Sequence, residues 1–356
     1  MSKFNGDKIK MEVWGESHSK DIGVILNGIE FDGEISLEQI QEFVNRRRAK
    51  KQAYSTTRLE EDVVIFERGI ENGKINGEIV AKINNEKMRS GDYSKIKNTP
   101  RPSHADYVAR VKYGDDYDFV GGGHFSGRMT APICIAGAIA KQILNARGIF
   151  VNAYIQNIGG IESKSYKNTE ISKVNFDELD SDFPLLDESV RPKMEEKIAN
   201  ARMNLDSVGG IIECVASGVP IGLGDYMFDS LEGKISQLIF AIPAIKGIEF
   251  GDGFDFKGEV GSNANDQMRI QDGKVKIISN HNGGILGGIS NGEPLTLAVV
   301  VKPTPSISKP QQSVNLVSMQ DVTLEIGGRH DACIVPRAVP VVEAVVMLAI
   351  LDEILK

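Results

Sequence analysis

Apolar and polar positions alternate in short blocks along this chain, and the period of the alternation changes several times. The clearest helical spacing lies in residues 36–49, where Leu37, Ile40 and Phe43 fall on one face. Ser36 and Gln39 open that segment with a capping-box pattern. Apolar or alternating runs predict strands at 8–14, 23–26, 63–66, 78–83, 210–217 and 295–301.

Three further segments predict helices. Residues 130–147 are apolar almost all round, so we expect a helix at the centre of the molecule, capped by Thr130 and stopped by Gly148. Residues 229–242 begin with a capping pattern, Asp229 and Glu232, and residues 337–355 close the chain as a helix. Strands and helices mix without a regular βαβ period, which favours an α+β fold.

The whole chain, residues 1–356, reads as a single domain, because no linker rich in Pro, Gly or Ser divides it. The stretch 162–200 is the most polar and the least patterned. We expect an insertion or a mobile surface hairpin there.

Composition narrows the class of protein. The hydrophobic fraction is 41% and the net charge is −8, values that suit a globular protein and argue against general binding to nucleic acid. Cys134, Cys214 and Cys333 are widely separated and predict reduced thiols in a cytoplasmic protein. The N-terminus has no apolar segment typical of a signal peptide, and the apolar run 339–351 is too short for a membrane span.

All five histidines lie in short polar or Gly-rich segments, where a buried structural histidine is not expected. One of these segments, 121–128, runs directly into the predicted central helix. A Gly-rich loop at a helix N-terminus offers free N–H groups to a phosphate, although such loops are common. The histidines are His18, His104, His124, His281 and His330.

Arginines accompany these segments. The triplet 46–48 ends the first predicted helix, with more basic residues up to Arg58; a solvated helix end would explain it equally well. Arg101, Arg128, Arg329 and Arg337, however, lie within or beside the histidine segments. Several arginines in an acidic protein predict a small polyanionic substrate. Metal-binding motifs and a phosphate-binding Walker loop are absent from the sequence, and no metal is expected.

Three segments, in this order, resemble the signatures of the chorismate synthase family: Gly15-Glu16-Ser17-His18, Ser126-Gly127-Arg128-Met129-Thr130, and Arg329-His330-Asp331-Ala332-Cys333. The resemblance extends from about residue 8 to residue 355. It implies a β-α-β sandwich with central helices and outer sheets, a homotetramer, and reduced FMN as cofactor. The implied reaction is an anti-1,4-elimination of phosphate from 5-enolpyruvylshikimate 3-phosphate, giving chorismate without net redox change in the shikimate pathway.

The same resemblance implies roles for individual residues. His18 is the expected general acid, His104 a hydrogen-bond partner of the reduced flavin, and Asp331 a proton acceptor near flavin nitrogen 5. The expected substrate ligands are Ser17, Arg47, Arg48, Arg101, Arg128 and Arg337. The expected flavin ligands are His124, Phe125, Ser126, Pro243, Ala244, Gly287, Lys302, Pro303, Thr304, Pro305, Ser306 and Arg329.

The chain departs from the family pattern at several of these positions. His124-Phe125 stands where the family commonly has Arg-Ser, and Pro243 where it has Asn. Pro305 and Ser19 also differ, and Ala53 takes the place of a second nucleotide-contacting arginine. NADPH is expected to act only indirectly, by reducing the flavin, with an external flavin reductase as the favoured route.

Two other functions stay open at this point. One is a flavin- or phosphate-binding homologue without turnover. The other is a hydrolase that uses Ser17, His104 and Asp331, although this hypothesis leaves the Gly-rich loops and the arginines unexplained.

Overall fold

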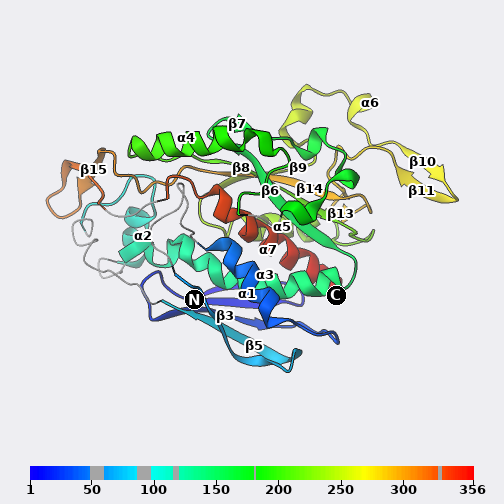
Figure 1. The fold of residues 1–356 in the computed structure, drawn as a ribbon, viewed down its shortest axis with the longest axis horizontal. Coiled ribbons are helices and arrows are strands. Elements are labelled where there is room, and N and C mark those ends of the chain that lie inside the picture. The colour runs from blue at the N-terminus through cyan, green and yellow to red at the C-terminus, as the bar shows by residue number, and fades with distance from the viewer. Residues whose placement is uncertain (49–59, 86–97, 115–119, 180–181, 328–330) are drawn as a thin grey trace.

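Two five-stranded antiparallel sheets enclose a layer of helices (Figure 1). The computed structural model describes residues 1–48, 60–85, 98–114, 120–179, 182–327 and 331–356. This architecture confirms the predicted α+β class with helices inside and sheets outside.

The first sheet is built from the N-terminal quarter of the chain. Its strand order is β1-β2-β3-β5-β4, and each pair is antiparallel. The alternation seen in the sequence places Ile22, Val24 and Leu26 in the core. The strands are β1 (Ser2–Asn5), β2 (Lys10–Gly15), β3 (Asp21–Asn27), β4 (Val64–Glu71) and β5 (Lys74–Asn84).

The second sheet is built from strands within residues 150–301, in the order β7-β6-β8-β14-β9. Its central strands β8 and β14 are almost wholly buried. Helices cover one face of the sheet, and residues of the polar stretch 162–200, such as Tyr166 and Leu179, cover part of the other. The strands are β6 (Phe150–Ile158), β7 (Ile161–Glu162), β8 (Gly210–Ser217), β9 (Ile245–Phe250) and β14 (Leu295–Val301).

The helical layer contains α1 (Leu37–Arg47), α3 (Thr130–Asn145), α5 (Leu231–Ile239) and α7 (Val335–Ile354). Helices α3 and α7 cross at Gly137 and Ala344. A Cβ atom added to Gly137 would lie only 2.3 Å from the Cβ of Ala344, so glycine is what allows this close approach. The crossing brings the N-terminal ends of both helices to the same region of the molecule.

The described parts of the stretch 162–200, residues 162–179 and 182–200, lie along the outer side of the second sheet (Figure 1). Tyr166 packs there with Tyr154, and α4 (Arg191–Met203) buries Met194 and Ile198. The carboxylate of Glu213 on β8 holds the segment, because it accepts hydrogen bonds from the Tyr154 hydroxyl at 2.8 Å and the Tyr166 N–H at 2.9 Å. Burial raises the pKa of Glu213.

Shorter elements complete the described part of the chain. The hairpin β10–β11 extends away from the body of the molecule (Figure 1). No helix of the described ranges is long and apolar enough to cross a membrane. These elements are α2 (Asp106–Tyr113), α6 (Gly261–Ala264), β10 (Met268–Gln271), β11 (Lys274–Ile277), β12 (Ile285–Leu286), β13 (Ile289–Ser290), β15 (Gln311–Asn315) and β16 (Gln320–Leu324).

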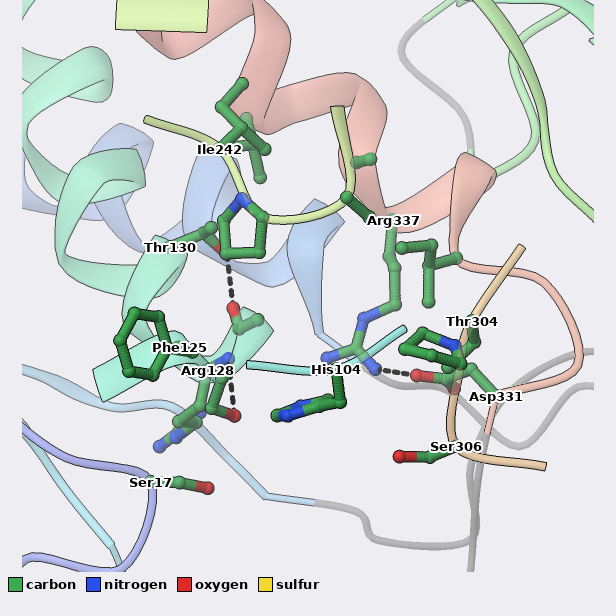
Figure 2. Close-up of a pocket in the computed structure, with 18 of the residues that line it drawn as sticks. Ser17, His104, Phe125, Arg128, Thr130, Ile242, Thr304, Ser306, Asp331 and Arg337 are labelled. Carbon is green, nitrogen blue, oxygen red and sulfur yellow. Dashed lines mark hydrogen bonds and ion pairs between the residues drawn. The ribbon is translucent and has the colours of Figure 1, made fainter. Parts of the chain in front are cut away.

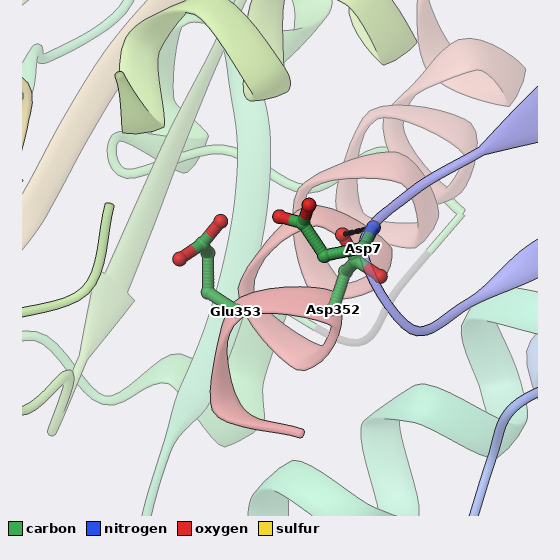
Figure 3. A group of neighbouring side chains, drawn as sticks. All are labelled: Asp7, Asp352 and Glu353. Carbon is green, nitrogen blue, oxygen red and sulfur yellow. Dashed lines mark hydrogen bonds between the residues drawn. The ribbon is translucent and has the colours of Figure 1, made fainter. Parts of the chain in front are cut away.

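Three neighbouring carboxylates near the C-terminus of α7 join the two ends of the chain (Figure 3). Asp352 accepts hydrogen bonds from the backbone N–H groups of residues 7, 8 and 9. Asp7 and Glu353 both form ion pairs with Lys234 and Lys356. The cluster is therefore compensated internally and acts as a structural clamp.

Helix caps differ from the sequence prediction in two places. Ser36 caps α1 as predicted, accepting from the Gln39 N–H at 3.2 Å. For α5 the cap is Ser230, not Asp229, because the Ser230 hydroxyl is the group that accepts from Gly233. For α3 the prediction of Thr130 as the cap was wrong: Thr130 begins the helix, and its hydroxyl donates to the Gly127 carbonyl.

Candidate active site

A cavity of about 590 Å³ opens where the N-terminal ends of α3 and α7 meet the loops of both sheets. Figure 2 shows Phe125 and the Arg337–Asp331 pair on opposite sides of this space, with His104 between them. Five lysine and arginine side chains and three carboxylates are among the described residues that line it. The cavity is thus locally cationic in a chain whose net charge is −8.

Arg47 is one of the cationic side chains that line the cavity, and it is only 3% exposed. Its Nε donates to the Thr130 hydroxyl at 3.1 Å, and one terminal nitrogen donates to the Gly127 carbonyl at 2.6 Å. Burial, together with the charges of Arg337 and Arg128, lowers the pKa of Arg47 to about 10, while Asp62 opposes the shift. A buried cation held against its neighbours in this way favours an incoming anion.

Two carboxylates from the segment before β4 neutralise part of this charge. Asp62 forms ion pairs with Arg128 and, at 3.5 Å, with Arg47. Glu60 lies 2.8 Å from the other terminal nitrogen of Arg128. Asp62 has a positive φ of 49°, a conformation that Asp adopts more readily than most residues.

The arginine triplet that ends α1 points in three directions. Arg46 forms a bidentate pair with the buried Glu343 of α7, so it holds two central helices together. Arg47 enters the cavity, and Arg48 donates to the Glu60 carbonyl and to Asn45. One member of the triplet therefore lines the cavity, and the other two have structural contacts.

Asp331 and Arg337 form a pair at the start of α7. Their closest atoms are 2.7 Å apart, and both side chains line the cavity (Figure 2). The pair leaves Asp331 beside the cavity as a carboxylate with a fixed orientation.

His104 lies between Phe125 and the Arg337–Asp331 pair (Figure 2), and its ring is held by residues of its own loop. Its Nδ1 lies 2.7 Å from Oδ1 of Asp106, the first residue of α2. Both oxygens of Asp106 also accept from Arg101, at 2.7 Å each, and Arg101 donates to the Ser306 hydroxyl at 3.0 Å. The side chain of Asp106 is fully buried, and Arg101 lowers its pKa against the effect of burial.

Apolar side chains also line the cavity. Among them are Phe125, Phe240, Ile242 and Pro243. His124, which precedes Phe125, reaches Glu16 with a 3.1 Å contact between Nε2 and Oε1. Ala244 has a positive φ of 74°, and its carbonyl accepts from the Lys302 N–H, which fixes the turn before β9 against β14.

The loop that follows β14 completes the cavity with Lys302, Thr304, Pro305 and Ser306. Burial, with Lys246 nearby, lowers the pKa of Lys302, whose Nζ donates to the Ser103 carbonyl at 2.7 Å. The Thr304 hydroxyl is buried and has no hydrogen-bond partner among the described residues. It is therefore available to a bound ligand.

Most of the predicted site residues meet in this one cavity, but several do not line it. His18 is half-buried and follows Ser17, which does line it. Gly287 lies in the β12–β13 turn, and Pro303 and Arg48 are also outside the lining set. Arg329, and with it His330 and Ala53, lies outside the described residues.

The sequence reading assigned no role to three carboxylates of the site, Glu60, Asp62 and Asp106. Asp106 follows His104 by two residues, and this short spacing is the signal in the sequence that could have identified it. Glu60 and Asp62 follow the basic run after α1, and only the fold brings them to Arg128.

The geometry does not support the hydrolase alternative. The carboxylate that orients His104 is Asp106, whereas Asp331 is paired with Arg337. A Ser-His-Asp triad needs one histidine between the nucleophile and its orienting carboxylate. Asp331 does not take that place.

Known proteins similar to this chain agree on one family. The family profile described as chorismate synthase matches residues 9–355. A chorismate synthase from Dehalococcoides mccartyi is 42% identical over 357 residues, covering 100% of this chain and 97% of the relative. One from Methanocaldococcus jannaschii is 44% identical over 362 residues, covering 99% and 96%. A solved structure titled "Crystal Structure of Chorismate Synthase" superposes with a TM-score of 0.77 at 26% identity, covering 99% of this chain and 93% of that one.

Proposed function

This chain belongs to the chorismate synthase family, whose activity it shares, and we propose that the cavity between α3 and α7 is where its own residues carry out the reaction. The substrate, 5-enolpyruvylshikimate 3-phosphate, carries one phosphate and two carboxylates. The observation that supports this site best is the surplus of cations in an acidic chain, centred on the buried Arg47.

Arg47, Arg128 and Arg337 hold the anionic groups of the substrate. Guanidinium groups match phosphate and carboxylate oxygens by paired hydrogen bonds. The N-terminal ends of α3 and α7 add partial positive charge at the same place. Arg48 does not line the cavity, and Arg101 holds Asp106 and Ser306 in place, so we assign both arginines to shaping the site.

The described residues fit a flavin nucleotide. An apolar wall of Phe125, Phe240 and Pro243 suits the ring system, and the buried Thr304 hydroxyl offers an unused hydrogen-bonding group. Lys302 adds a cation beside it. His124, Ser126, Ala244, Pro305 and Ser306 complete this set of ligands.

Reduced FMN, when bound, supplies electron density that the elimination uses and returns, so no net redox change results. The C3–O bond breaks and phosphate leaves with its electron pair, neutralised by the arginines. The C6–H bond also breaks: its hydrogen leaves overall as a proton, and its electron pair becomes part of the new double bond of the ring. Asp331, held by Arg337, would take up this proton at the side of the cavity, and His104, which also lines the cavity, would be a hydrogen-bond partner for the cofactor.

His18 remains our candidate for the acid that protonates the leaving phosphate. It is half-buried in the loop between β2 and β3, directly after Ser17. If this role is correct, His18→Gln lowers turnover by about 10²–10⁴-fold without weakening FMN binding. Full turnover in that variant would exclude the role.

We further propose a homotetrameric, cytoplasmic enzyme. The hairpin β10–β11 and the 221–228 segment expose large apolar side chains, such as Ile270 at 71% and Phe228 at 92%, which suits contacts between copies of the chain. All three cysteines are free and buried, as is usual for a reducing compartment. Light scattering of the purified protein tests the tetramer: a monomeric mass would contradict it.

The function itself is tested by anaerobic turnover with chemically reduced FMN. Equal amounts of chorismate and phosphate support the proposal. FMN binding without any product would favour the homologue without turnover. NADPH added with an external flavin reductase should replace the chemical reductant, whereas NADPH alone should not.

A further inference from the structure

We propose that Asp106 is a positioning residue that fixes the ring of His104 with its proton on Nδ1 and its Nε2 toward the cavity. This inference rests on the proposed function for its effect on turnover, but not for its effect on the ring. It starts from four contacts of one buried carboxylate.

The distances decide which nitrogen of His104 carries the proton. Nδ1 lies 2.7 Å from Oδ1 of Asp106 and 3.2 Å from a terminal nitrogen of Arg101. If Nδ1 accepted from Arg101, two lone pairs would face each other at 2.7 Å, which is repulsive. A proton on Nδ1 turns the same contact into a short charge-assisted hydrogen bond.

Asp106 cannot turn away from His104, because its other contacts fix it. Its Oδ2 accepts from the Arg101 backbone N–H at 3.0 Å and from the Arg101 Nε at 2.7 Å. Its Oδ1 accepts from the Arg101 terminal nitrogen as well as from His104. The carboxylate also stands at the N-terminus of α2, where a negative charge is favoured.

The other edge of the ring points toward the Gly-rich turn before α3. A Cβ atom at Gly122 would lie 3.4 Å from Cε1 and 3.5 Å from Nε2 of His104. Gly122 has a positive φ of 92°, so glycine suits both the backbone and the space. The neutral ring therefore presents an acceptor, and the protonated ring a donor, at a position that Asp106 determines.

Asp106→Asn is the informative substitution, since it keeps the shape and removes the charge. Arg101 presents two donors to Oδ2, so the amide oxygen of Asn turns toward Arg101. The amide nitrogen then faces Nδ1 of His104, which must become an acceptor. The variant should therefore move the ring proton to Nε2.

The experiment is long-range proton–nitrogen NMR of the ¹⁵N-histidine-labelled protein without cofactor, at a pH where His104 is neutral. The His104 signal is identified by its loss in His104→Gln. The wild-type protein should show a protonated Nδ1 and an unprotonated Nε2, and Asp106→Asn should show the reverse. Ser306→Ala is the matched control, because it removes a different partner of Arg101 and should leave the ring proton on Nδ1.

Turnover gives the second measurement. Asp106→Asn should lower kcat about 10²–10⁴-fold, the size of an acid–base effect, with a smaller change in KM. A protonated Nε2 in the wild-type protein, or turnover of Asp106→Asn within twofold of wild type, would overturn the proposal. If the wild-type ring is as described but the protein makes no chorismate, the proposed function fails while the role of Asp106 in fixing the ring stands. The wild-type spectrum by itself shows which nitrogen of His104 carries the proton. The proposal can therefore be refuted even if Asp106→Asn fails to fold.

Discussion

Asp62 offers a direct way to test how the cationic side of the cavity is balanced. Its side chain is 2% exposed and forms ion pairs with Arg128 and Arg47. Asp62→Asn preserves the volume, and Asn tolerates the positive φ of 49° at least as well as Asp. The substitution therefore removes one charge and little else.

The expected cost follows from the environment of Arg47. Burial already lowers the pKa of Arg47 even with Asp62 present, so its charge depends on this carboxylate. Removing one partner of a buried ion pair costs about 3–5 kcal/mol. We expect the free energy of unfolding of Asp62→Asn to be about 3 kcal/mol below that of wild type.

Urea unfolding followed by circular dichroism measures this difference, with and without inorganic phosphate. Phosphate should restore more stability to the variant than to the wild type, because an anion can take the place of the lost carboxylate. Glu67→Gln is the control: it breaks the exposed pair with Lys82 and should leave stability almost unchanged, because exposed ion pairs contribute little. A loss below about 1 kcal/mol in Asp62→Asn, or no added response to phosphate, would refute the reasoning.

Four other outcomes follow from the structure. Asp331→Asn should lower kcat about 10²–10⁴-fold while leaving the circular dichroism spectrum unchanged. Phe125→Ala should weaken FMN binding about tenfold, through the loss of roughly 1.4 kcal/mol of contact, as measured by flavin fluorescence; unchanged affinity would exclude Phe125 from the flavin wall. Gly137→Val should lower the free energy of unfolding by at least about 1–3 kcal/mol, because its side chain would overlap Ala344; a stable variant would contradict the close packing of α3 and α7. Because the pKa of Glu213 is raised in the folded protein, its contribution to stability is complete below the unfolded value of ~4.3 and is lost as the pH rises through the folded value. Glu213→Gln should therefore lower the stability measured by thermal unfolding more at pH 4 than at pH 8.

Local pattern predicted much of the fold. The apolar periods identified the two strands 210–217 and 295–301 with the bounds that the structure has, and the all-round apolar segment became the central helix α3. The first strand, Ser2–Asn5, was not predicted, because a polar edge strand of four residues has almost no apolar pattern. The predicted cap at Asp229 was wrong because the Ser230 hydroxyl accepts from Gly233 instead. The predicted cap at Thr130 was wrong because a 3-10 turn, Gly127–Met129, leads directly into α3 and places Thr130 inside the helix.

The sequence indicated many of the residues that line the cavity, but it did not indicate which of them form ion pairs and hydrogen bonds with one another. The histidine and arginine segments led to the residues that line the cavity, including His104, Arg128 and Asp331. Their partners could not be read from spacing, because Asp62 meets Arg128 only when the segment before β4 folds against the start of α3. The three consecutive arginines look alike in the sequence, yet the turn of α1 sends only Arg47 into the cavity.

The most direct test of the account is a single anaerobic turnover in which chorismate, phosphate and the flavin spectrum are recorded together. Enzyme, chemically reduced FMN and 5-enolpyruvylshikimate 3-phosphate are mixed in the absence of oxygen. The account predicts one chorismate and one phosphate per substrate consumed, with the flavin reduced at the end as at the start. Substrate left intact while FMN is bound, or one flavin oxidised for each product formed, would contradict it.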